Sequence, residues 1–210
     1  MIKPSTSASD GSVSVSGDNS GNILNVNAGD GATFNFQLES RIARELPSFL
    51  SAVIVLFSQQ SLAEYSLGSR RTLPPEVIQK VAYNNFPESH QILVDYRRHS
   101  LVLERSYHGV EQQNDDARYL VRRKAAVAYQ SQLASACKAA SIPLPMHGAY
   151  ARNNAVTLIS AVIDELLQEY KSSKTIMVEQ ETAHLAISLV VADAVVECEV
   201  LERPTDAVTA

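Results

Sequence analysis

Apolar and polar residues alternate in the N-terminal part of the chain, with a period of two. The alternating apolar residues form three groups, which are Val13 with Val15, Ile23 or Leu24 with Val26, and Phe34 with Phe36. Such alternation is typical of β-strands that have one apolar face. Segments rich in Asp, Asn and Gly lie between the groups, at residues 17–21 and 29–31, and favour tight turns. The pattern therefore predicts three short antiparallel strands.

After Gln37 the apolar residues recur at intervals of three and four, which is typical of helices. The expected helices cover residues 39–67, a short segment opened by Leu73-Pro-Pro-Glu, and residues 87–109, 114–141, 149–171 and 177–201. Pro47 is expected to bend the first helix or to restart it. The last segment is apolar on nearly every side, so we place it at the centre of the protein. The fold class predicted is mainly α, a multi-helix bundle with a small N-terminal antiparallel β arm.

The expected domain organisation follows from these segments. Residues 1–37 form the β arm, of which residues 1–10 are Ser-rich and expected to be mobile. Residues 38–203 form the helical bundle, and residues 204–210 form a disordered tail. Three strands of this size bury too little surface to be stable alone. They need a partner, which is either the bundle of the same chain or the arm of another copy.

Composition and charge narrow the functional classes. The chain has 210 residues, of which 45% are apolar and 20% charged, as expected of a soluble globular protein. The net charge of -5 argues against a general polyanion-binding protein. We expect Cys137 and Cys198 to be buried free thiols, which suits a reducing cytoplasm. The sequence shows neither a signal-peptide pattern nor an apolar run of membrane-spanning length, so we expect a cytoplasmic protein without a membrane partner.

One pair of residues has the spacing of a metal-binding motif. Glu181 and His184 form a Glu-x-x-His pair, which di-iron bundles carry twice together with two further glutamates. This chain carries it once, so the favoured interpretation is a histidine that lies at the helix surface or makes one hydrogen bond in the core, with a metal site as the alternative. The five histidines share no other motif, and no phosphate-binding loop is present. We therefore expect no cofactor and no enzymatic activity.

Two acidic residues lie about one turn apart on the apolar final helix. Asp193 and Glu197 need cationic partners if they are buried, because an unpaired charge in a core is costly. The expected partners are Arg118, Arg122 and Arg152, which would form an ion-pair network that fixes the helix register. The alternative is an acid pair that holds a metal or acts in acid and base catalysis.

The basic residues suggest a further alternative, contact with nucleic acid. Arg97-Arg98 and Arg122-Arg123 are interleaved with tyrosines along the chain, and such pairs can hold phosphates. Consecutive residues on a helix point in different directions, however, so they do not face one ligand together. Solvated helix faces and ion pairs within the bundle are therefore the favoured interpretation.

The N-terminal strands also show a family resemblance. The segments 13–22 and 29–34 resemble the Gly/Asn/Val-rich short strands found near the N-termini of accessory components of bacterial conflict and antiviral defence systems. In those systems such strands accompany NTPases of the STAND type and multi-component assemblies with an ABC-type ATPase. The resemblance implies an accessory or assembly subunit, and it carries no catalytic residue over to this chain.

These observations favour a non-enzymatic interaction subunit that forms homo-oligomers through its β arm. The residues expected at that interface are the alternating apolar ones, namely Val13, Val15, Ile23, Val26, Phe34 and Phe36. Phe34 and Phe36 are the expected anchors, because aromatic side chains bury the largest area. A protein partner encoded in the same operon is also expected. A metal-dependent helical-bundle enzyme or sensor and a nucleic-acid-binding regulator are the two alternatives.

Overall fold

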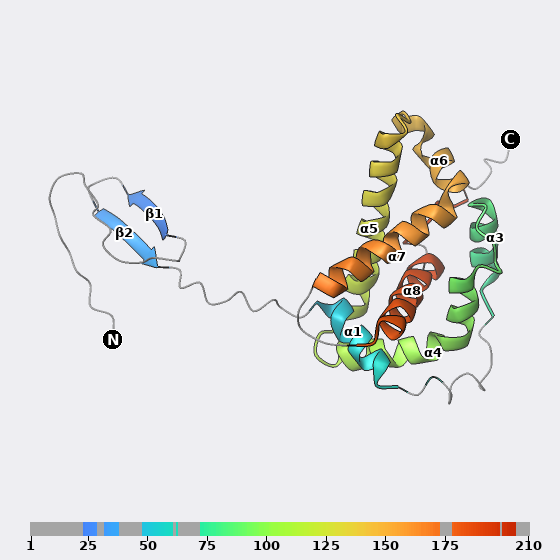
Figure 1. Cartoon of the computed structure of the whole chain (residues 1–210), viewed down its shortest axis with the longest axis horizontal. Coiled ribbons are helices and arrows are strands. Elements are labelled where there is room, and N and C mark those ends of the chain that lie inside the picture. The colour runs from blue at the N-terminus through green and yellow to red at the C-terminus, as the bar shows by residue number, and fades with distance from the viewer. Residues whose placement is uncertain are drawn as a thin grey trace. The chain divides into compact units, whose positions relative to one another are not determined.

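The computed structural model describes residues 23–28, 32–37, 48–60, 62, 72–172, 178–197 and 199–204. The chain divides into two compact units, Met1–Leu46 and Pro47–Ala210. The described part of the second unit is helical, and its elements are drawn in Figure 1. The prediction of a mainly α-helical bundle is confirmed for these residues.

The described residues of the first unit form two antiparallel strands, β1 (Ile23–Ala28) and β2 (Ala32–Gln37). Their register sets Leu24 opposite Phe36 and Val26 opposite Phe34. It also sets Ile23 opposite Gln37. The third expected strand, with Val13 and Val15, lies outside the described residues.

The second unit is built from one short 3₁₀ turn and seven helices within the described ranges. These elements are α1 (Phe49–Ser58), α3 (Pro75–Tyr83), α4 (Gln91–Glu111), α5 (Ala117–Ala139), the 3₁₀ turn η1 (Leu144–Met146), α6 (His147–Asn153), α7 (Ala155–Ser172) and α8 (Gln180–Val196). Helix α8 lies in the middle and packs against α1, α4, α5 and α7 (Figure 1). Its expected central position is confirmed.

Local sequence explains where several helices begin. Ser48 caps α1, because its Oγ accepts a hydrogen bond of 3.1 Å from the backbone N–H of Ser51. Pro75 opens α3 at a position where a missing N–H costs nothing, as expected from the sequence. Asn114 precedes α5, and its side chain accepts from the N–H of Asp116 at 2.9 Å. These polar contacts satisfy backbone groups that a helix leaves free at its start.

Several expected helix boundaries are wrong. The first helix, α1, ends at Ser58 rather than near residue 67, and α4 begins at Gln91 rather than at residue 87. Gly109 does not end α4, which continues to Glu111; a Cβ at Gly109 would lie 2.7 Å from Leu56 Cδ1, so this glycine lets α1 approach closely. The helix expected over 149–171 is two helices, α6 and α7, which are separated at Asn154. The Asn154 side chain donates to the carbonyl of Tyr150 at 2.8 Å, and such side-chain bonds compete with helix continuation. Helix α8 ends at Val196 rather than near residue 201.

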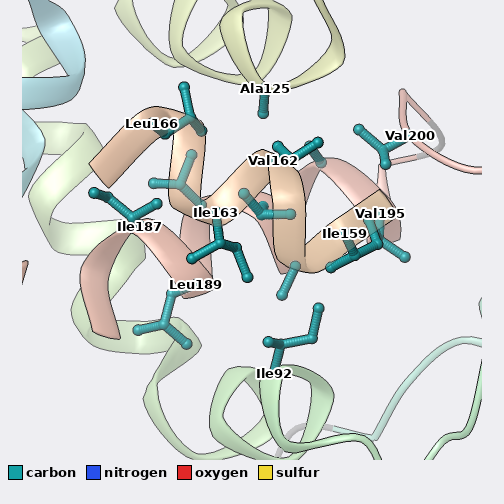
Figure 2. Packing of buried hydrophobic residues seen from close by; sticks show 14 of the residues in the cluster. Ile92, Ala125, Ile159, Val162, Ile163, Leu166, Ile187, Leu189, Val195 and Val200 are labelled. Atoms are coloured by element: carbon teal, nitrogen blue, oxygen red, sulfur yellow. The ribbon is translucent and has the colours of Figure 1, made fainter. Parts of the chain in front are cut away.

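The core of the second unit forms around α7 and α8. Figure 2 shows Ile159, Val162 and Ile163 of α7 packed toward Ile187, Leu189 and Val195 of α8. Ala125 of α5 and Ile92 of α4 close the cluster from two sides. Burial of a side chain such as leucine or isoleucine contributes roughly 1.5–3 kcal/mol. The described part of this unit therefore has a substantial core of its own.

Candidate functional site

One charged group in the described bundle interior is the carboxylate of Asp193 on α8, which is only 1% exposed. Its two oxygens have separate partners. The Tyr96 hydroxyl donates to Oδ1 at 2.9 Å, and Arg122 Nε donates to Oδ2 at 2.7 Å. Tyr96 belongs to α4 and Arg122 to α5, so one buried carboxylate ties three helices together. We call Asp193, Tyr96 and Arg122 the Asp193 network.

Arg122 extends the network toward the surface. Its Nη2 lies 3.6 Å from Glu197 Oε1, and its guanidinium carbon lies 5.9 Å from the centre of the Tyr107 ring. Burial of Arg122 is partial, and the carboxylates of Asp193 and Glu197 favour its charged form. The buried negative charge of Asp193 is therefore compensated by a cation that reaches the solvent boundary.

Tyr107 lies against two guanidinium groups. The guanidinium carbon of Arg118 is 5.0 Å from its ring centre, close enough for a cation–π contact. Burial raises the pKa of Tyr107 well above its ordinary value of 10.0, and the nearby Asp193 carboxylate raises it further. Both effects favour the protonated phenol.

Of the three arginines expected to pair with Asp193 and Glu197, only Arg122 does so in the described part of the structure. Arg122 pairs with Asp193 and Glu197, but Arg118 pairs with Glu104 and Glu111, each at 2.9 Å. Arg152 Nη1 donates to the Tyr83 hydroxyl at 2.9 Å. The network expected from sequence thus separates into three local contacts. The reason is geometric, because two carboxylates of α4 lie within ion-pair distance of the Arg118 guanidinium.

The residues considered for metal binding are at the surface. Glu181 and His184 lie in the first two turns of α8, and both side chains are exposed. Within the described residues no group of three or more His, Cys, Asp or Glu side chains is placed to hold a metal ion. Cys137 is buried with a free thiol, and Cys198 lies outside the described residues.

The basic residues considered for nucleic-acid contact do not form one surface. Arg97 is paired with Glu88 at 2.9 Å, and Arg122 is held by Asp193. Arg98 on α4 and Arg123 on α5 are both exposed. Two of the four arginines are therefore engaged within the bundle, and the other two project from different helices.

A second buried polar cluster was not anticipated from the sequence. Lys80 of α3 is 1% exposed, and its Nζ donates to the carbonyl of Val195 at 2.8 Å, near the end of α8. Asn84 donates to the carbonyl of Glu202 at 2.7 Å and accepts from its N–H at 3.0 Å. These bonds hold residues 199–204 against α3. The available signal was the spacing of Lys80 and Asn84, which share a helix face with Val77 and Val81.

Comparisons with known proteins add no assignment: no family model matches the chain, and neither curated proteins nor solved structures gave a match. Among the described helices, none combines the length and apolar character needed to cross a membrane.

Proposed function

We propose that the protein is a non-enzymatic interaction subunit that self-associates through its N-terminal β arm. The observation that carries the proposal is the register of β1 and β2, which sets Leu24 opposite Phe36 and Val26 opposite Phe34. Because residues two apart in a strand share a face, these four residues occupy one face of the pair. A two-stranded sheet is marginal in water without a surface to cover its apolar face.

The same register refines the set of interface residues. Ile23 falls opposite Gln37, on the other face of the pair from Val26. The pairing therefore favours Leu24 over Ile23 as the partner of Val26, Phe34 and Phe36. Asn25 opposite Asn35 and Asn27 opposite Thr33 make the second face polar. This division into an apolar and a polar face is the pattern of a sheet that packs on one side.

The bundle supports a binding role rather than a catalytic one. Asp193, Arg122 and Tyr96, the three residues of the Asp193 network, are paired with one another in a packed interior. The resemblance of the arm to strands of defence-system components adds a setting, an accessory subunit of a bacterial defence system. In that setting the partner is a protein encoded in the same operon, and the bundle would contact it.

A pair of double variants tests the proposal. Replacing Phe34 and Phe36 by serine removes the two largest residues of the apolar face, and we expect the native mass measured by light scattering to fall. Replacing Asn25 and Asn35 by serine changes a directly opposed pair on the polar face, and the oligomer should persist. An unchanged mass in the phenylalanine variant, at concentrations where the parent is oligomeric, would refute an arm-mediated assembly.

A further inference from the structure

The outward face of α5 carries an unusual set of exposed apolar side chains. Tyr119 is 59% exposed, Leu120 40% and Val127 54%. The opposite face of the helix packs on α7, α8 and α4. On one flank, Lys124 pairs with Glu169 and Gln132 donates to Glu165, so α7 borders the exposed face without covering it.

The exposed apolar residues follow a heptad spacing. Leu120, Val127 and Ala134 recur every seven residues, and all three are exposed. A seven-residue repeat sets these residues in one row along the helix, which corresponds to one of the two positions, a and d, of a helix-pairing seam. The repeat is symmetric about Val127, because Leu120 and Ala134 lie at equal distances on either side.

We propose that this face of α5 is a second interface between copies of the chain, an antiparallel helix pair with its two-fold axis at Val127. A two-fold axis pairs each residue before Val127 with the residue equally far after it. Leu120 of each copy therefore meets Ala134 of the other, so a large side chain faces a small one.

The charges along the same face favour the antiparallel direction. Asp116 and Lys138 are exposed at the two ends of α5, equally far from Val127, so each meets its opposite charge in the other copy. The exposed Arg123 meets the neutral Ser131. A parallel pair would instead place Arg123 against Arg123 and Lys138 against Lys138, and such like-charge contacts cost free energy.

The α5 interface needs no residue of the arm, so it goes beyond the proposed function. Its seam is narrow, with one apolar residue per heptad, and we expect the contact to be weak in the isolated bundle. Copies that are already held together by their arms would form it readily, because tethering raises the effective concentration of the second contact. The two interfaces together would join neighbouring bundles as well as neighbouring arms.

Disulfide trapping in the full chain tests this arrangement. Val127→Cys places a thiol on the two-fold axis, and mild oxidation should yield a covalent dimer on a non-reducing gel. Leu101→Cys on α4 is a matched control, because Leu101 is 51% exposed and lies outside the seam. Leu120→Cys tests the register, since the rise of a helix would set the two Leu120 positions about 20 Å apart. Leu120→Cys combined with Ala134→Cys should again cross-link.

The outcomes separate this inference from the arm proposal. If Val127→Cys is the one single variant that forms a covalent dimer, the result supports the antiparallel seam. The parent chain, treated in the same way, measures the background cross-linking from its own two cysteines. Cross-linking of Val127→Cys no greater than that of Leu101→Cys would overturn it, as would equal cross-linking of Leu120→Cys. Adding Phe34→Ser and Phe36→Ser to the Val127→Cys variant should slow disulfide formation. The disulfide should still join position 127 of one copy to position 127 of the other. If the native mass were unaffected by those arm changes, the arm proposal would fail while the trapping result still stood.

Discussion

At the scale of single residues, the ion pair of Asp193 and Arg122 joins α8 to α5 in the interior of the bundle. An acid on an apolar helix requires a cation, so a partner for Asp193 was predictable. Which arginine supplies it was not, because that depends on how α4 and α5 lie against α8. Arg118 is one turn from Arg122 on the same helix, yet it pairs with Glu104 and Glu111 of α4.

The two members of this pair should respond differently to substitution. Arg122→Met leaves a buried carboxylate without its cation and should cost about 3–5 kcal/mol of unfolding free energy. Asp193→Asn keeps an acceptor for Tyr96 and leaves an arginine that can still reach Glu197, so we expect about 1–3 kcal/mol. Urea denaturation measures both values. Arg98→Met, at an exposed position of α4, is the control and should change stability by no more than about 0.5 kcal/mol.

Tyr107 makes the stability of the bundle sensitive to alkaline pH. Its pKa is raised in the folded state, mainly by burial, so folding favours the protonated phenol. The corresponding stabilisation is complete below about pH 10 and is lost as the pH rises from there toward the folded-state pKa. Tyr107→Phe should therefore flatten the fall in unfolding free energy above about pH 10. Equal slopes for parent and variant in urea denaturation would show that Tyr107 does not contribute.

At the scale of elements, periodicity identified the helical regions but not all of their ends. The Pro75 start was readable because proline fixes the first helical turn. The break at Asn154 and the continuation through Gly109 were not readable. The first depends on a side-chain bond to Tyr150, and the second on the approach of Leu56 from another helix. The end of α8 likewise depends on contacts with α3 that are distant in sequence.

Asn84 holds the segment that follows α8, residues 199–204, against the end of α3. Its side chain pairs with both the N–H and the carbonyl of Glu202, as a neighbouring backbone would. Asn84→Ala should cost about 2 kcal/mol, because two backbone groups lose their partner. Hydrogen exchange at the Glu202 amide should become faster. Gln79→Ala, at an exposed position of the same helix, should leave that amide protected, and equal exchange in both variants would contradict this role for Asn84.

At the scale of the whole molecule, the sequence indicated the central position of α8, because this helix carries apolar residues on nearly every side. The arrangement of the other helices around α8 was not predictable, since each presents only one apolar stripe and many packings satisfy it. The β arm as a whole stays a prediction from local signals, which are its period of two and its turn residues. Under the proposed assembly, the register of β1 and β2 favours Leu24 over Ile23 at the interface.

The central claim is that the N-terminal unit joins copies of the chain. The most direct test is the native mass of the full chain and of residues 47–210, measured by light scattering at the same micromolar concentration. The described bundle has its own core, so the shortened chain should remain helical by circular dichroism. We predict a discrete oligomer for the full chain and a monomer for the shortened one. A full chain that is monomeric, or a shortened chain that keeps the full oligomer, would contradict the claim.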